Sequence, residues 1–393
     1  SVVWGPFSIV WGLGIVLATM FLGSCKDDDP ESNSIPEGTA DAQINEDRTL
    51  VTSENVTNWT QYAVQVANLL TKDATTLKNA WVDDYKGLGS YAEQFKNPGT
   101  GKDYTSYVGC AQQIIEGCAD IANEVGTAKI GEPRDLWESG KYTEAVYAVE
   151  SWYSYHSIDD YSNNILSIRN AFNGTTDGKE ASSSIASYLK AKNNALYEQT
   201  KKEINAAYNA IKGMASPFRS HIGNSSVTEA QKACATLEAT LTNSVKPALL
   251  NATESELEPI IKNYVDVVVV PTYELLVTRN VALNTAVRNL ANNPSTATFE
   301  LAANAWMQAR EPWEMSEAFL FGPVADLGLD PNMDSWPLDA AALKNILSNG
   351  NFQELEWEGE FDEEDETISA AQNVRGFHTL EFLLFYMGEP RTY

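Results

Sequence analysis

Residues 59–81, WTQYAVQVANLLTKDATTLKNAW, repeat apolar side chains at steps of three and four residues. This spacing places the apolar side chains on one face of an α-helix. The same period returns over residues 107–125, 185–211 and 230–241. Short polar breaks such as NPGTG at 97–101 separate these stretches. Long helices joined by short polar loops predict an all-α fold built from helical bundles.

One apolar run, Val267–Val270, is ambiguous because its β-branched residues also favour strands. Pro271 ends the run, and no partner strand is evident nearby. We therefore predict a helix that is kinked at Pro271.

The composition limits the classes of protein to which the chain can belong. The chain has 393 residues, of which 43% are hydrophobic and 21% are charged, as is usual for globular proteins. Its formal net charge of −27 argues against nucleic acid as a partner, because such a surface repels a phosphate backbone. A change of composition over residues 247–259 predicts two helical units, 57–250 and 251–393.

The first residues predict an export signal. Residues 1–24 are almost uncharged and end in LGS before Cys25, which resembles a bacterial lipobox. We expect a lipoprotein signal over 1–25, lipidation of Cys25 and a polar tether over 26–56. The protein would then be an outer-membrane lipoprotein of the cell envelope, facing the periplasm or the medium. A short transmembrane anchor is the alternative.

The other three cysteines are Cys110, Cys118 and Cys234. Cys110 and Cys118 lie eight residues apart in a helical pattern, about 12 Å along the helix axis, which is too far for a disulfide between them. We predict buried thiols, with pairing of one of them to Cys234 left open.

The stretch RGFHTLEFLLF at 375–385 carries the first chemical signal. His378 and Glu381 are three residues apart, so their side chains share a face if the stretch is helical. Imidazole and carboxylate together suit zinc or iron, but two ligands cannot complete a site. A histidine that only hydrogen-bonds a buried carboxylate is the structural alternative.

The stretch REPWEMSE at 310–317 carries the second signal. If it is helical throughout, Arg310, Glu314 and Glu317 lie on one face. An arginine beside two carboxylates keeps them ionised, so that they accept hydrogen bonds or ligate cations.

These two stretches together are similar to motifs of the imelysin family. Residues 150–154, ESWYS, and 58–62, NWTQY, resemble other parts of that family, so the resemblance covers nearly all of 58–393. In the family's usual order the half that contains the histidine motif comes first, whereas here it comes last. We therefore predict a circular permutation, in which the helix from residue 58 packs against the helix of His378. A chimaeric or truncated sequence would give the same order.

The resemblance implies two four-helix-bundle-like units in permuted order, an envelope location and a part in iron acquisition. It predicts a binding protein that holds iron, zinc or an iron-containing ligand, with the membrane and an iron-uptake transporter as candidate partners. The predicted metal ligands are His378, Glu381 and Glu317, and the supporting residues are Arg310, Glu314, Ser316 and Gly376.

The family also carries the name of a peptidase, which gives a second hypothesis: a zinc metallopeptidase in which His378 and Glu381 are catalytic. The His-Glu-x-x-His pattern of zinc peptidases is missing, so we favour a non-enzymatic role. Asp159, Asp160 and Asn163 could add ligands, although helix capping and a solvated face are the favoured interpretation.

Overall fold

The computed structural model describes residues 50–393, and this part of the chain is almost entirely helical. Within it the only strands are β1 (Phe385–Tyr386) and β2 (Glu389–Pro390), an antiparallel pair of two residues each. The predicted all-α fold class is therefore confirmed. The predicted signal over 1–25, its Cys25 and residues 26–49 of the predicted tether lie outside the described residues.

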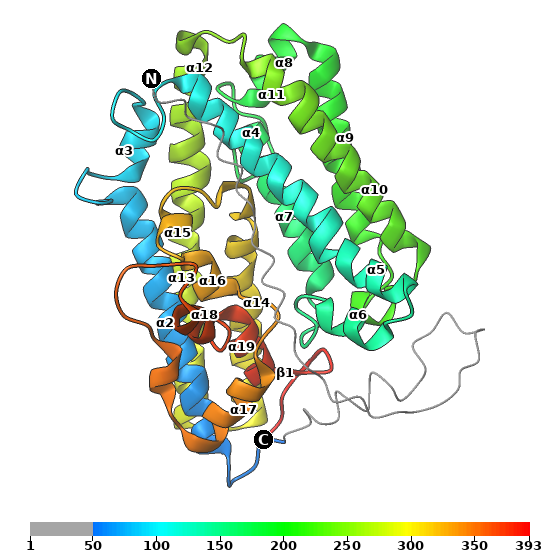
Figure 1. The fold of residues 1–393 in the computed structure, drawn as a ribbon, viewed down its shortest axis with the longest axis vertical. Coiled ribbons are helices and arrows are strands. Elements are labelled where there is room, and N and C mark those ends of the chain that lie inside the picture. The colour runs from blue at the N-terminus through cyan, green and yellow to red at the C-terminus, as the bar shows by residue number, and fades with distance from the viewer. Residues whose placement is uncertain (1–49) are drawn as a thin grey trace. The chain divides into compact units, whose positions relative to one another are not determined.

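One group of helices contains both the first long helix and the last. α2 (Val56–Val82) lies alongside α13 (Val270–Asn292) and also packs on α19 (Gly376–Leu384), while α13 packs on α14 (Thr296–Glu314) (Figure 1). Long-range hydrogen bonds tie α2 to the histidine motif. The indole Nε1 of Trp59 donates to the carbonyl of Leu383 at 2.8 Å. The expected packing of the helix from residue 58 against the helix of His378 is confirmed.

A second group of long helices lies beside the first. α4 (Tyr107–Glu124), α7 (Ser157–Asn173), α9 (Asn194–Lys212) and α10 (Ser225–Thr240) pack on one another, and α7 also packs on α14. One hydrophobic cluster runs through both groups. Because α2 precedes residue 250 yet packs with helices that follow it, contacts do not simply follow chain order. The division into 57–250 and 251–393, like the permuted order, stays a prediction.

Shorter helical elements connect these helices. They are α3 (Tyr91–Lys96), η1 (Val125–Lys129), α5 (Gly131–Glu138), α6 (Tyr142–Ala148), α8 (Ile185–Lys192), η2 (Phe218–Ser220), η3 (Leu241–Val245), α11 (Lys246–Leu249), α12 (Glu254–Asn263), η4 (Tyr264–Val269), η5 (Glu317–Phe319), α15 (Pro323–Asp326), α16 (Leu329–Asp334), α17 (Ala340–Asn349), η6 (Phe352–Leu355) and α18 (Glu366–Gln372).

The ambiguous run before Pro271 is helical, as predicted, while the kink at Pro271 stays a prediction. α12 continues into a π-helical turn, η4, and then into α13, where Pro271 stands in the first turn. Proline has no amide hydrogen to donate, so a helix accommodates it most easily where the hydrogen-bond pattern changes.

The cysteines of the described region are all buried and free. Pairing of one of them with Cys234, which we had left open, is therefore wrong for Cys110 and Cys118. Burial raises the pKa of the Cys110 and Cys234 thiols to about 12, so both stay protonated. Over residues 50–393, no helix is both long enough and apolar enough to cross a membrane.

Candidate metal centre

Helix α14 brings the first two site residues into the interior. It begins at a capping box in which the Ser295 hydroxyl accepts the Thr298 amide at 3.2 Å. Near its other end, Arg310 and Glu314 stand one turn apart, both fully buried, with Nη2 and Oε1 2.7 Å apart.

The helix ends at Glu314, which corrects one expectation. The amide and hydroxyl of Ser316 both donate to the Trp313 carbonyl, at 2.8 and 2.7 Å, and close the last turn. Glu317 consequently begins the 3₁₀ turn η5 and does not continue the helical face of Arg310. The prediction that all three residues lie on one helical face is therefore wrong for Glu317. The supporting role of Ser316 stays a prediction.

The guanidinium of Arg310 gathers carboxylates from several elements. Its Nη2 lies 2.7 Å from Glu150 Oε1 in the loop after α6, and its Nε lies 3.1 Å from Asp160 Oδ2 on α7. Its Nη1 pairs with Asp334 Oδ1 at the end of α16. With Glu314, four acidic side chains therefore surround one buried arginine.

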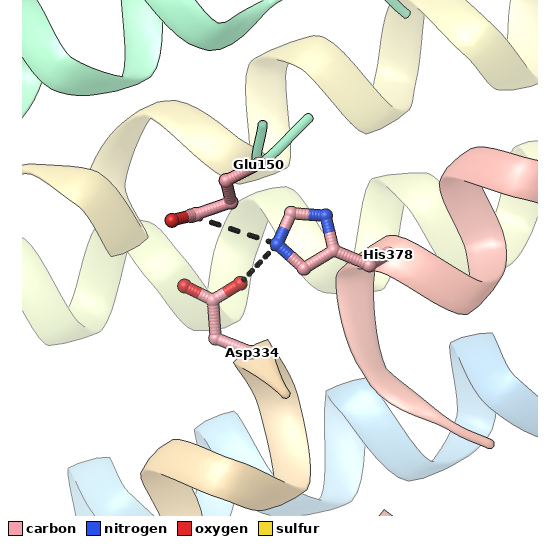
Figure 2. Close-up of side chains that lie close together, drawn as sticks. All are labelled: Glu150, Asp334 and His378. Atoms are coloured by element: carbon pink, nitrogen blue, oxygen red, sulfur yellow. Dashed lines mark ion pairs between the residues drawn. The ribbon is translucent and has the colours of Figure 1, made fainter. Parts of the chain in front are cut away.

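His378 faces this group from α19. The helix starts at Gly376, whose φ of +85° suits glycine and where a Cβ would lie 2.5 Å from the Met333 carbonyl oxygen. His378 is 0% exposed, so the imidazole points inward as expected. Its Nε2 lies 3.1 Å from Asp334 Oδ1 and 3.5 Å from Glu150 Oε1 (Figure 2). The ligand atoms of these three residues lie within 4.8 Å of one another.

Glu381 contacts the other nitrogen of the same ring. Its Oε2 lies 2.9 Å from His378 Nδ1, and its Oε1 accepts the amide and the hydroxyl of Ser154, at 2.8 and 2.7 Å. A carboxylate that accepts Nδ1–H fixes the ring and leaves Nε2 to face a ligand. Some groups of side chains in the described residues have ligand atoms close enough to share one cation, but the predicted ligands His378, Glu381 and Glu317 do not together form such a group. Glu381 as a direct ligand stays a prediction.

Several residues of this centre were not predicted from the sequence. Glu150 was quoted only as part of a family motif, and Asp334 was not singled out. Lys129, on the π-helical turn η1, gave no signal, yet its Nζ lies 2.9 Å from Glu150 Oε2. Asp160, interpreted as a cap, is fully buried against Arg310.

Burial and neighbouring charges shift the pKa values in opposite directions. Burial raises the pKa of Glu150, but the charge of Lys129, the hydrogen bond from His378 and the charge of Arg310 outweigh it and bring it to about 2. Burial raises the pKa of Glu314 well above its usual value, and Arg310 offsets this only in part. Burial and the charge of Arg310 lower the pKa of His378, but its hydrogen bonds to carboxylates outweigh both and raise it well above 6.5.

The centre contains more acidic than basic groups. Buried charge without a partner is costly, so the surplus must be neutralised by protons or by a bound cation. An imidazole nitrogen with two carboxylate oxygens is a donor set that suits iron or zinc. One buried oxygen, Asp160 Oδ1, also accepts no hydrogen bond, although His156 Nε2 lies 3.9 Å from it. These side chains therefore fit a metal ion. The basic groups are Arg310, Lys129 and His378, and the acidic groups are Glu150, Asp160, Glu314, Glu317, Asp334 and Glu381.

A surface hollow of about 530 Å³ lies elsewhere, between α9 and α10, and is lined by residues such as Glu198 and Lys202. None of the residues around Arg310 lines it.

The chain therefore combines an all-helical fold with a buried centre of histidine, arginine and carboxylate side chains. The sequence model of the imelysin family matches residues 36–244 and 269–392. An imelysin peptidase from Bacteroides ovatus, known from its crystal structure, is 50% identical to this chain in sequence. The match covers 88% of this chain and 99% of that chain, and the two structures superpose with a TM-score of 0.86. The chain belongs to the imelysin family.

A shorter match links the chain to a protein named for iron. Iron-regulated protein A of Synechococcus elongatus is 35% identical over 130 residues, which are 33% of this chain. The match spans 32% of the length of that protein.

Proposed function

We propose that this imelysin-family protein binds iron, or an iron-containing ligand, at the His378 centre and acts in iron acquisition at the cell envelope. The observation that carries the proposal is the buried group of Glu150, Asp334 and His378, whose ligand atoms lie within 4.8 Å of one another. The similarity to a protein named iron-regulated protein A supports the choice of iron.

Each residue has a distinct part in this proposal. His378 Nε2, Glu150 Oε1 and Asp334 Oδ1 would hold the metal, and Glu381 orients the imidazole through Nδ1. Arg310 keeps the two carboxylates ionised and in place. Because Nε2 faces two carboxylates, His378 must release the proton on Nε2 before that nitrogen can act as a ligand.

The test is metal binding by the full chain. The protein is stripped with a chelator, loaded separately with ferrous iron and zinc, and analysed for bound metal by mass spectrometry. His378→Ala should lose the bound metal. His221→Ala is a matched control, because the Nδ1 of His221 contacts the Pro217 carbonyl at 2.9 Å and His221 belongs to none of the candidate ligand groups. Equal metal content in the wild type and His378→Ala would contradict the proposal.

A zinc peptidase is the second candidate function, supported by the relative described as an imelysin peptidase. A peptidase needs a carboxylate that is free to activate water. Glu150 and Asp334 are held by Lys129, Arg310 and Trp313, so neither of these two carboxylates is free for that role. Metal-dependent cleavage of casein that His378→Ala abolishes would favour the peptidase, whereas bound iron without cleavage favours binding.

The envelope location rests on the lipobox-like residues before Cys25. Cys25→Ser should remove the lipid mass from the protein and release it from the outer-membrane fraction. A membrane-bound Cys25→Ser variant would argue against the lipid anchor. A functional link to an iron-uptake transporter predicts slower growth of a deletion strain under iron limitation.

A further inference from the structure

Glu317 stands apart from the other acidic residues of the centre. It is 6% exposed, and within residues 50–393 its carboxylate makes no hydrogen bond and no ion pair, although the charge of Lys129 partly offsets the rise in its pKa that burial causes. By contrast, Asn164 donates to Glu314 Oε2 at 2.6 Å, and Trp313 donates to Asp334 Oδ2 at 2.7 Å. A carboxylate buried to this degree is costly in its charged form, so it takes up either a proton or a cation.

The Glu317 carboxylate is aimed at two other acidic side chains. One oxygen each of Glu314, Glu317 and Asp334 lie within 4.8 Å of one another. Oxygens that share one cation, with bonds of about 2.0–2.6 Å, lie at most roughly 4–5 Å apart. The three residues are thus close enough to hold a single ion. His378 is not a member of this group.

The two partners of Glu317 retain the capacity to bind a cation. Glu314 Oε1 is fully buried and accepts no hydrogen bond, although Arg310 Nη2 lies 2.7 Å away. Asp334 Oδ1 contacts Arg310 and His378. A carboxylate oxygen carries two lone pairs, so an ion contact to one side leaves room for a metal on the other.

The backbone holds these three residues at fixed places. Glu314 is the last residue of α14, Glu317 is the first residue of η5, and Asp334 is the last residue of α16. The turn between Glu314 and Glu317 is closed by Ser316, through its bonds to Trp313. Ligands on helical elements bind with less loss of conformational entropy than ligands on free loops.

We propose that Glu314, Glu317 and Asp334 form a second cation position, distinct from the His378 position. Three carboxylates without nitrogen or sulfur prefer a hard divalent cation such as Mn²⁺. Asp334 belongs to both positions, so its carboxylate would bridge two ions when both are bound. The second position does not require that the protein bind iron at His378.

The experiment titrates Mn²⁺ alone into the chelator-treated full chain and follows free Mn²⁺ by its paramagnetic resonance signal. The wild type should bind Mn²⁺ in a stoichiometric amount, and Glu317→Gln should weaken this binding at least tenfold. Glu311→Gln is the matched control, because Glu311 is an exposed residue of α14 outside the ligand groups, and it should bind like the wild type. Unchanged binding in Glu317→Gln, or no binding by the wild type at millimolar Mn²⁺, overturns the proposal.

His378→Ala separates the two positions. It should lose iron or zinc but keep Mn²⁺, since the second position contains no histidine. If His378→Ala abolishes Mn²⁺ binding, the ion belongs to the His378 position and the second position does not exist. If the wild type binds Mn²⁺ but neither iron nor zinc, the proposed function fails and the second position stands.

Circular dichroism of each variant shows whether it is folded. If Glu317→Gln does not fold, Glu317→Asp replaces it, because a shorter side chain keeps the charge but withdraws the oxygens. Glu317→Asp should also bind Mn²⁺ at least tenfold more weakly. Wild-type affinity in a folded Glu317→Asp overturns the proposal.

Discussion

Arg310 Nη2 lies 3.4 Å from His378 Nε2, although both side chains carry a positive charge when the imidazole is protonated. The contact is tolerated because the same nitrogens also share acidic partners. Glu150 Oε1 is 2.7 Å from Arg310 Nη2 and 3.5 Å from His378 Nε2, and Asp334 Oδ1 contacts both residues. Two helices, α14 and α19, are thus held together through carboxylates supplied by other parts of the chain.

Removal of Arg310 should be strongly destabilising. Arg310→Met leaves several buried carboxylates without their cation, and breaking a buried ion pair in this way costs about 3–5 kcal/mol. Urea unfolding should show this loss in the free energy of unfolding. Lys202→Met, at an exposed position of α9, should change it by less than about 0.5 kcal/mol. A loss for Arg310→Met no larger than that of Lys202→Met would contradict the assigned role of the guanidinium.

The metal-free protein should lose stability in acid through Glu150. Its pKa is lowered from 4.5 to about 2, because Lys129, His378 and Arg310 outweigh the effect of burial. A group with a depressed pKa stabilises the fold above its unfolded pKa, and this stability is lost as the pH falls toward 2. A shift of this size corresponds to roughly 3 kcal/mol.

The contribution of Glu150 to the free energy of unfolding is measured by urea unfolding at pH 6 and at pH 3, with the wild type compared with Glu150→Gln. The raised pKa values of Glu314 and Glu317 act in the opposite direction, since both groups favour folding while they are protonated and this contribution is lost as the pH rises above 4.5. The comparison cancels them. An equal loss of stability on acidification in both proteins would rule out Glu150 as the responsible group.

The sequence predicted the helices more fully than the centre they carry. Periodicity identifies a helix because it depends on neighbours three and four residues away, as along α2 and α4. It failed at Glu317, because the Ser316 bonds that end α14 depend on side-chain chemistry that periodicity does not include. Lys129 reaches Glu150 through a π-helical turn and tertiary packing, which no local pattern encodes.

Glu381→Gln should weaken metal binding without removing a predicted ligand at Nε2. The neutral amide is a poorer acceptor for His378 Nδ1–H and for the two donors of Ser154, so the ring is less firmly oriented. Loss of such a partner typically lowers metal affinity about 10–100-fold. Iron and zinc titrations compare the variant with the wild type, and complete loss of binding would instead identify Glu381 as a direct ligand. An unchanged metal affinity would show that Glu381 does not orient the His378 imidazole for metal binding.

Gly376→Ala should disturb the start of α19 and with it the position of His378. The residue has a φ of +85°, and a Cβ there would lie 2.5 Å from the Met333 carbonyl oxygen, so both the backbone and the packing resist a side chain. Strain of this kind costs about 1–3 kcal/mol, before the cost of the clash is added. Gly99→Ala is the matched control, because a Cβ at Gly99 meets nothing within 4 Å and no left-handed φ is required there. Thermal unfolding should show a clear decrease in the melting temperature for Gly376→Ala and almost none for Gly99→Ala.

Because Met333 directly precedes Asp334, the backbone shift that relieves the clash should also move Asp334. Gly376→Ala should therefore bind metal more weakly even at temperatures where it is folded. Wild-type stability together with wild-type metal affinity in Gly376→Ala would show that the close approach of α19 to α16 does not position the centre.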